Sequence, residues 1–318
     1  MASRLGRSRI PFALALAIAL LIAEVVIEPS FAKPGNWPGE LSVLAPFAIL
    51  AMASTPSVLS GGGGIDLTVG PLSTVINCIF VAWLIPHGWN GLESVVVLLA
   101  IGAAVGFVNG MLVAVLRYQP VVATLCGFFI LAGLAEKIAP NPLPLPANWT
   151  THLAGKVGPI PGGLIMIACP LVIWWLLGRT SYLRALYAVG GDDASAYSAG
   201  IDVVKVRVLA YTLGGLFTAI GGIALTALIQ TSSAATASQY ALIAVAGVAL
   251  GGTSFAGGRG GMFQSLLGAF CIYMIQQLLS SANVSATYQQ VVYGAVLIAG
   301  VLISTRFPRG FTVRRLAT

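Results

Sequence analysis

Residues 92–116 read LESVVVLLAIGAAVGFVNGMLVAVL, an apolar stretch whose one charged residue, Glu93, stands near its start. A helix that crosses the hydrocarbon core of a bilayer needs about 20 predominantly apolar residues. The stretch therefore predicts a transmembrane helix. Within it, Gly102, Gly106 and Gly110 recur every four residues and share one helix face. Such a face lets a neighbouring helix approach closely, so we expect tight helix packing there.

The composition of the whole chain agrees with a lipid environment. Hydrophobic residues make up 58% of the sequence and charged residues 8%, whereas an ordinary soluble domain has about 25% charged residues. The formal net charge is +7, but the basic residues lie in short clusters between apolar runs. Clusters in that position are typical of topology determinants, so no nucleic-acid partner is expected.

About ten apolar runs of this kind can be marked along the chain. They cover approximately residues 10–28, 41–60, 70–86, 92–116, 120–139, 161–178, 206–230, 240–256, 262–280 and 287–305. The third and the eighth are short, and we expect them to be broken or partly re-entrant. The predicted fold class is an all-α, polytopic transmembrane helical bundle that forms a single domain over residues 1–318.

Lys and Arg near helix ends favour the cytoplasmic side of a membrane. With the N-terminus inside, every basic residue except Lys33, Lys137 and Lys156 falls in a cytoplasmic segment. Both termini are therefore expected in the cytoplasm. The first run, followed by Ser30-Phe31-Ala32, also resembles a cleaved signal peptide. We favour an uncleaved anchor because its apolar stretch is long for a signal.

Residues that could carry enzyme chemistry are sparse. His87 and His152 fall in expected external loops, and no arrangement of nucleophile, base and metal ligands is evident, so no catalytic residue and no metal site is predicted. The Gly155-Lys156 pair is followed by Val157 and does not fit a phosphate-binding loop. No cofactor is expected on this chain, and ATP-driven work would need a separate ATPase.

Three loop stretches differ from the apolar background. In the first, GGGGIDLTVGP at 61–71, Asp66 or Thr68 is positioned to cap the next helix, with a role for Asp66 in a transport pathway as the alternative. The second, YAVGGDDASAYSAGI at 187–201, predicts a short helix capped by Asp192 or Asp193 that ends at Gly200.

The short helix would form a knob that could dock in a partner's groove. The third stretch, LGGTSFAGGRGG at 250–261, follows no strand and does not fit the dinucleotide-binding pattern G-x-G-x-x-G.

In this order, the three stretches resemble the permease subunits of the ribose-type branch of bacterial ATP-binding-cassette importers. The likeness rests on a G-I-D-L-S-V-G-like segment at 64–70, an A-x-G-G-N/D-x-x-A-x-x-x-G-I loop at 188–201 and an L-G-G-T-S-x-x-G-G-x-G turn at 250–260. The stretch GFVNGMLV at 106–113, followed by PVVATL at 120–125, is also similar. The resemblance covers roughly residues 40–305. It fails at 240–244, where relatives often have acidic residues and this chain has YALIA.

The resemblance implies a multi-pass protein of the bacterial cytoplasmic (inner) membrane that works by alternating access. Its partners would be a second permease subunit, identical or paralogous, two ATPase subunits that bind ATP and Mg²⁺, and an extracytoplasmic solute-binding protein. It also implies an ATPase-coupling loop within residues 179–205. The coupling residues would be Gly190, Gly191, Asp192, Asp193, Ala194, Ala196, Tyr197, Gly200 and Ile201.

A small polar solute, with a monosaccharide as the leading expectation, would need polar groups along its path. The candidates are Asp66, Asn77, Asn109, Thr124, Gln230, Gln264 and Gln276. Amides within the membrane also serve as hydrogen bonds between helices, and this reading stays open for each of them. The rival function is a stand-alone secondary carrier or channel. It is disfavoured because Glu24 and Glu136, the acids within apolar runs, lie near an outer end.

Overall fold

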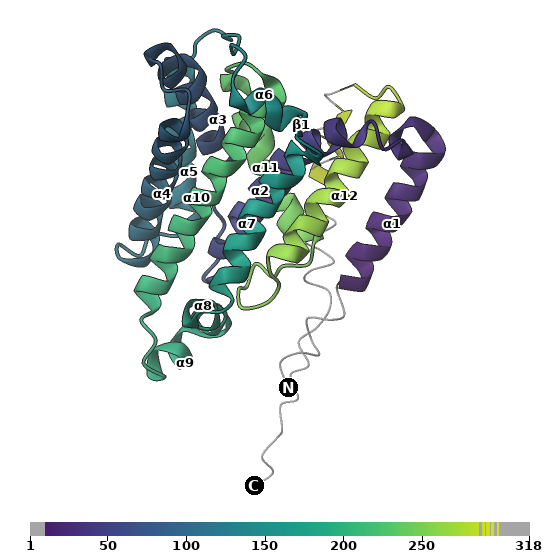
Figure 1. Cartoon of the computed structure of the whole chain (residues 1–318). Helices are drawn as coiled ribbons and strands as arrows, with labels where there is room; N and C mark the ends of the chain where they lie inside the picture. Colours follow the sequence, from purple (N-terminus) through teal and green to yellow (C-terminus); the bar gives the residue numbers. More distant parts are fainter. Residues whose placement is uncertain (1–9, 286–287, 290, 293, 296–297, 299–318) are drawn as a thin grey trace.

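The computed structural model of the chain describes residues 10–285, 288–289, 291–292, 294–295 and 298, and this part is almost entirely helical (Figure 1). The α-helices are α1 (Ile10–Ile27), α2 (Trp37–Leu59), α3 (Val69–Ile79), α4 (Leu92–Ala114), α5 (Pro120–Ile138), α6 (Trp149–Ala154), α7 (Gly162–Leu177), α8 (Ser181–Gly191), α9 (Asp193–Ser198), α10 (Val203–Ile229), α11 (Ala237–Leu250) and α12 (Met262–Ser281). Short helical turns are η1 (Pro29–Ala32), η2 (Phe80–Leu84), η3 (Ile85–His87) and η4 (Ala234–Thr236). Two short strands, β1 (Lys156–Val157) and β2 (Ile160–Pro161), form an antiparallel hairpin. The all-α, polytopic class expected from the sequence is confirmed.

Six helices of the described part are long and apolar enough to cross a membrane. They are Trp37–Leu59, Val69–His87, Leu92–Ala114, Pro120–Ile138, Val203–Ile229 and Met262–Ser281. The number becomes seven if α7 and α8, which meet at a bend of 89°, are one broken span. The first and eighth expected runs form shorter apolar helices, Phe12–Ile27 and Gln239–Leu250. The tenth, 287–305, falls largely outside the described residues, so the count of ten stays a prediction.

The third run was expected to be broken or partly re-entrant, but Val69–His87 is one continuous helix in which only the helix type changes. After α3 the backbone changes to a π-helical turn, η2, and then to the 3₁₀ turn η3, which ends at Gly88 with φ +82°. The eighth run is shorter than expected, because α11 ends at Leu250 and the following residues form a turn. The glycines of this turn, such as Gly252 with φ +86°, adopt a conformation that a helix cannot continue.

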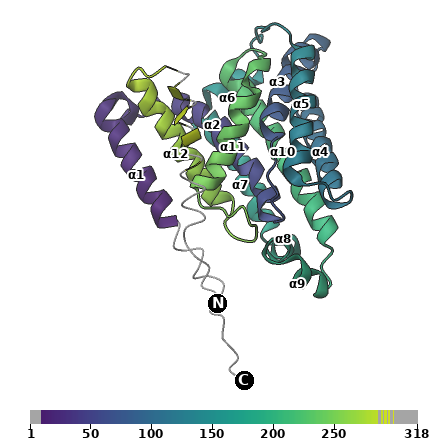
Figure 2. The same ribbon diagram turned by 180° about the vertical axis from the view of Figure 1, so that it is seen from behind.

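The centre of the bundle is α2, and 89% of the residues in its apolar window are buried. It packs against α10, α11, α12 and α7. In the apolar windows of α4 and α5, only 28% and 22% of the residues are buried. These two helices lie together at one edge of the bundle, and α1 lies at the opposite edge (Figures 1 and 2). Large side chains on α5, such as Phe129 and Ile130, are exposed there, as expected for a surface covered by lipid.

Helix α10 joins this edge to the centre, since it packs on both α4 and α2. The contact with α4 uses the glycine face expected from the sequence. A Cβ placed on Gly102 would lie 2.5 Å from the carbonyl oxygen of Gly215, and one on Gly110 would lie 2.8 Å from the Cα of Val208. No larger residue fits at these positions without separating the two helices, so the predicted packing role is confirmed.

Candidate functional site

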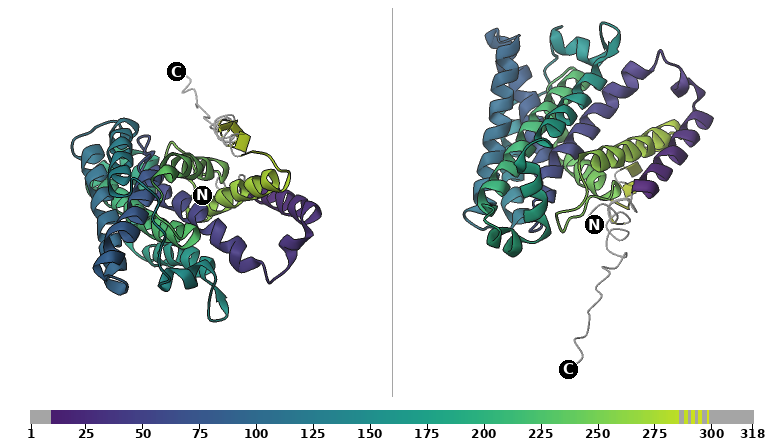
Figure 3. Two further views of the ribbon diagram at one scale, coloured as in Figure 1. Left: turned by 90° about the horizontal axis from the view of Figure 1, so that it is seen from above. Right: turned by 60° about the horizontal axis from the view of Figure 1, so that its bottom comes forward.

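The short helix expected in the loop at 187–201 is α9, and it lies at one end of the bundle beside α8 (Figures 1 and 3). Its N-cap is Asp192, whose Oδ1 accepts hydrogen bonds from the backbone N–H of Ala194 at 3.0 Å and of Ser195 at 3.1 Å. The bond from Ser195 is the largest cause of a lowered pKa at Asp192. Gly200, with φ +80°, follows the last turn. The predicted cap and the predicted helix end are both confirmed.

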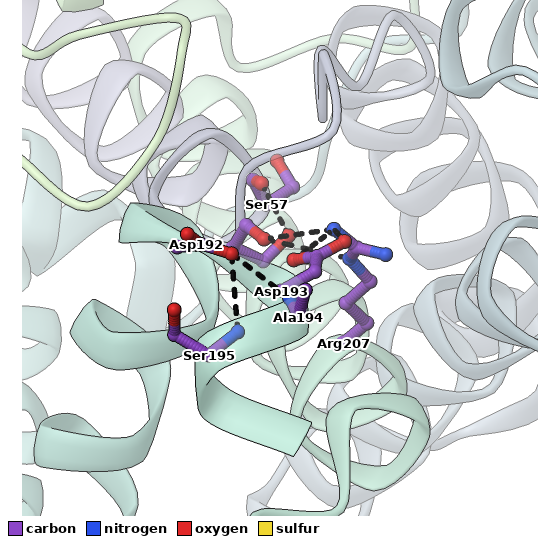
Figure 4. Close-up of polar contacts among 7 residues, drawn as sticks. Ser57, Asp192, Asp193, Ala194, Ser195 and Arg207 are labelled. Carbon is purple, nitrogen blue, oxygen red and sulfur yellow. Dashed lines mark hydrogen bonds and ion pairs between the residues drawn. The ribbon is translucent and has the colours of Figure 1, made fainter. Parts of the chain in front are cut away.

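Asp193, the first residue of α9, is paired with an arginine from α10. The Nη2 atom of Arg207 lies 2.8 Å from Oδ1 and 2.6 Å from Oδ2 of Asp193 (Figure 4). The same guanidinium donates to the carbonyl oxygen of Ser60, at 3.4 Å from Nε and 3.5 Å from Nη2. One side chain thus connects the start of α9, the start of α10 and the end of α2. Sequence reasoning did not identify Arg207.

A small apolar cluster packs α9 against the rest of the bundle. It contains Leu59, Leu183, Leu186, Val189, Ala196, Val206 and Ala210. Ala196 is the member from α9 and is 4% exposed, whereas the next residue, Tyr197, is 76% exposed. The helix therefore holds to the bundle by one small side chain and one ion pair, and it presents an aromatic side chain outward.

The three loop stretches singled out in the sequence meet where α8 packs against the end of α2. A Cβ on Gly190 would overlap the carbonyl oxygen of Leu59, and one on Gly257 would overlap the Cα of Gly61. The backbone N–H of Gly258 donates to the Leu59 carbonyl oxygen at 3.1 Å. We call Gly61, Gly190, Gly257 and Gly258 the glycine junction.

Backbone touches backbone throughout the glycine junction, which only residues without a side chain allow. Next to it, the hydroxyl of Tyr187 donates to the carbonyl oxygen of Gly260 at 2.9 Å. The end of α2, the helix α8 and the turn between α11 and α12 are therefore connected at one place. The abundance of glycine at three separated loops was the available indication, but the sequence did not show that the loops come together.

Three of the expected pathway residues, Asp66, Asn109 and Thr124, lie close together. The Nδ2 of Asn109 donates to Oγ1 of Thr68 at 2.9 Å, and that hydroxyl donates to Oδ1 of Asp66 at 2.6 Å. Thr124 donates to the carbonyl oxygen of Ile65 at 3.2 Å. Asp66 is 3% exposed, and burial raises its pKa, with the two hydrogen bonds from Thr68 acting in the opposite sense.

The expected helix cap in this region takes a modified form. Thr68 occupies the N-cap position of α3 but its side chain makes no capping bond. Asp66 instead accepts from the backbone N–H of Thr68 at 2.9 Å. Asp66 therefore fixes the turn that leads into α3, in agreement with the structural alternative. A role for Asp66 in solute passage stays a prediction.

Asn77 and Gln230 belong to a second polar group, near the other end of α10. Asn77 donates to Oγ1 of Thr226 at 2.9 Å and to the carbonyl oxygen of Thr231 at 3.0 Å, and its Oδ1 accepts from the N–H of Ser233 at 3.1 Å. Gln230, with φ +50°, ends α10 and donates to the carbonyl oxygen of Ala227 at 2.7 Å. These bonds connect neighbouring helices and loops.

Gln264 and Gln276 are both on α12, about 18 Å apart along the helix axis. Gln264 lies in the first turn, where its carbonyl oxygen contacts Gly251. The Oε1 of Gln276 is buried and has no hydrogen-bond partner among the described residues. The seven candidates thus fall into four separate places in a single chain, and their pathway role stays a prediction. No three His, Cys, Asp or Glu side chains within the described ranges are grouped so as to hold a metal ion.

Long apolar helices, with a capped short helix at one end, define a multi-pass membrane protein. Residues 40–301 match the family described as branched-chain amino acid transport system / permease component. The chain belongs to this family.

Three relatives illustrate the branch. The ribose import permease protein RbsC of Escherichia coli K12 is 33% identical over 92% of this chain and 92% of its own length. The fructose import permease protein FrcC of Rhizobium meliloti is 29% identical over 91% of this chain and 82% of its own. The probable ABC transporter permease protein YphD of Escherichia coli K12 is 31% identical over 86% of this chain and 82% of its own. No solved structure gives a significant match.

The resemblance expected from the sequence motifs is confirmed: the chain is a permease component of the ribose-type branch of ATP-binding-cassette importers. Permease components of such importers are not themselves enzymes, and they work with ATPase and solute-binding partners. The particular residues that meet those partners are not given by these similarities.

Proposed function

We propose that this chain moves a monosaccharide across the bacterial cytoplasmic membrane by alternating access, driven by two separate ATPase subunits. The observation that carries the proposal is the position of α9. It is exposed on its outer side, yet it packs on α8 and α10, and Arg207, which pairs with Asp193 of α9, also donates to the Ser60 carbonyl oxygen at the end of α2. A partner that displaces α9 would therefore displace three helices together, which is what a coupling element must do.

The proposed topology has about ten spans, with both termini and α9 in the cytoplasm. The arrangement of basic residues supports it. Arg117 and Arg207 line one cavity with Tyr197 of α9, and Arg259 lies in the turn that joins the glycine junction. Lys137 at the end of α5 and Lys156 in β1 lie at the opposite end of the bundle (Figure 1). This distribution is the one that the positive-inside rule requires.

A labelling experiment tests this topology. The exposed Cys126 and Cys169 are first replaced by Ser. Ser198→Cys on α9 should then react with a membrane-impermeant maleimide only after the membrane is opened, whereas Lys156→Cys in the β-hairpin should react in intact cells. Labelling of Ser198→Cys from outside would invert the orientation and remove α9 from any contact with a cytoplasmic ATPase.

The proposed assembly has two permease chains, identical or paralogous, around a central path, two ATPase subunits that bind ATP and Mg²⁺, and an external solute-binding protein. Two permease chains would also bring the separated candidate pathway residues of each copy into a common path. Reconstitution with labelled solute and ATP tests the assembly. Uptake that persists without any ATPase subunit and without ATP would replace this proposal by a stand-alone carrier or channel.

The solute class rests on the sugar permeases named above, whereas the family description names branched-chain amino acids. Uptake assays with labelled ribose, fructose and leucine, in vesicles that hold the complete transporter, distinguish the two. We expect uptake of a sugar that leucine does not inhibit. Leucine uptake without sugar uptake would overturn the assignment to monosaccharides.

Tyr197→Ala tests the role of α9 without disturbing packing, because the side chain is 76% exposed. We expect the variant to keep its helix content and thermal stability but to lose stimulation of the ATPase by the loaded binding protein. Tyr197→Phe, which keeps the aromatic ring, is the matched control. Normal coupling in both variants would contradict the proposed role of Tyr197.

A further inference from the structure

A cavity of about 590 Å³ opens beside α9. Its lining comes from α9, from the start of α10, from the glycine loop after α2 and from the turn between α4 and α5. Two of the lining side chains are arginines, Arg117 and Arg207, and one is a carboxylate, Asp193. The α4–α5 turn therefore shares a surface with α9, although four α-helices, α5 to α8, separate the two in the sequence.

The charges of this cavity do not balance. Arg207 is held by Asp193 at 2.6 Å. Arg117 is exposed and makes no ion pair in the part of the chain that the structure describes. The cavity therefore has one positive charge in excess of its own carboxylate, and it is complementary to an incoming anion.

The backbone of Arg117 gives an independent reason to look for a role of its side chain. Its φ is +56°, in the left-handed region where residues with a Cβ are strained and glycine is not. The turn is closed behind it by a hydrogen bond from the N–H of Tyr118 to the carbonyl oxygen of Leu112, at 3.0 Å. Glycine would adopt this conformation without strain, so the backbone itself does not call for an arginine at this position.

The aromatic side chains of the cavity indicate a protein partner. Tyr118 of the α4–α5 turn is 55% exposed and Tyr197 of α9 is 76% exposed, and both line the cavity with Arg117. Tyrosine and arginine are over-represented among the residues that dominate protein–protein binding energy.

We propose that this cavity is a second contact for the ATPase, in which a protruding segment of the ATPase places a carboxylate against Arg117. The inference rests on the proposed function, because it requires α9 to face that partner. In this arrangement α9 docks in a groove of the ATPase, and a segment of the ATPase docks in the cavity beside α9. The contact attaches the α4–α5 hairpin, whose two helices are the least buried of the six long spans, directly to the motor.

A photo-crosslinking amino acid in place of Tyr118 tests the occupant in the complete transporter in lipid nanodiscs. We expect a crosslink to the ATPase subunit, and digestion of that product should locate the crosslinked peptide next to an acidic residue. A crosslink to phospholipid alone would overturn the proposal and would assign the cavity to an anionic head group of the cytoplasmic leaflet.

Variants of Arg117 test the charge. Arg117→Gly relieves the backbone strain, so its thermal stability should equal or exceed that of the wild type, while its affinity for the ATPase should fall at least about tenfold. Arg117→Lys should restore part of the affinity. If Arg117→Gly binds the ATPase as the wild type does, this inference fails and the proposed function stands. If the wild-type chain binds no ATPase at all, the proposed function itself fails.

Discussion

A Cβ on Gly190 would overlap the carbonyl oxygen of Leu59, and it would also lie 2.5 Å from the backbone nitrogen of Gly258. This one position therefore controls how closely α8 approaches both the end of α2 and the turn between α11 and α12. A Cβ placed on the neighbouring Gly191 would have no other atom within 4 Å.

Gly190→Ala should separate the three segments of the glycine junction. Because the obstructing atoms belong to the backbone, relief requires movement of a helix, and we expect destabilisation of about 1–3 kcal/mol. Thermal unfolding in nanodiscs and ATPase stimulation measure the effect. Gly191→Ala is the matched control and should leave both unchanged. Equal behaviour of the two variants would show that the close approach at Gly190 has no consequence.

The N-cap of α9 should be sensitive to acid. Hydrogen bonds from the N–H groups of Ser195 and Ala194 lower the pKa of Asp192. A carboxyl whose pKa is lowered by folding contributes stability above its unfolded pKa of about 3.9, and this contribution is lost as the pH falls through the folded pKa. Hydrogen exchange of the α9 amides, corrected for intrinsic rates, should therefore become faster below about pH 4. Asp192→Ala should show fast exchange at every pH.

Asp66 should respond in the opposite direction. Burial raises its pKa from 3.8, so the ionised carboxylate is disfavoured in the folded protein, and stability falls as the pH rises through the interval between the unfolded and the folded pKa. Asp66→Asn keeps an oxygen that can accept from Thr68 and removes the ionisation. We expect this variant to match the wild type at low pH and to be the more stable at pH 7, as measured by thermal unfolding.

Asp66→Leu, in contrast, removes the acceptor and should destabilise the protein at all pH values, since two donors of Thr68 then lose their partner. An Asp66→Asn variant less stable than the wild type at pH 7 would show that the charge itself is needed in this loop.

Asn77→Ala separates a structural role from a role in the pathway. The substitution removes the hydrogen bonds of the Asn77 amide with the Thr226 hydroxyl, the Thr231 carbonyl oxygen and the Ser233 N–H, and we expect a loss of about 1–3 kcal/mol of stability. If the amide only connects helices, the maximal uptake rate should follow the amount of folded transporter and KM should not change. A raised KM at normal protein level would instead place Asn77 on the solute path.

Local features of the chain were predictable from the sequence. The hydropathy of residues 92–116 is sufficient for a membrane helix, and the four-residue spacing of Gly102, Gly106 and Gly110 is sufficient for a packing face, because both depend on helix geometry alone. The cap was predictable to within two neighbouring residues, Asp192 or Asp193, for the same reason. The number of spans could not be read from hydropathy alone, since the third run continues through η2 and η3 as one helix of 19 residues, whereas the eighth ends at Leu250.

Contacts between distant segments were not predictable. Nothing in the spacing of Gly61, Gly190 and Gly257 shows that these glycines touch, and nothing in the sequence pairs Arg207 with Asp193. The pathway candidates illustrate the same limit. An amide such as Asn77 or Asn109 can be located within an apolar run, but the side of the helix that it occupies depends on how the helices pack.

The bend of 89° between α7 and α8 makes the connection to the membrane helices a lever. With 11 residues, α8 is an arm of about 16 Å that stands crosswise to α7. A displacement of about 2 Å at its far end, where α9 is attached, corresponds to a rotation of about 7° at the elbow. A small displacement of α9 by a partner would thus tilt α7 rather than slide it along its axis. The tilt angle produced by a given displacement would depend on the length of α8.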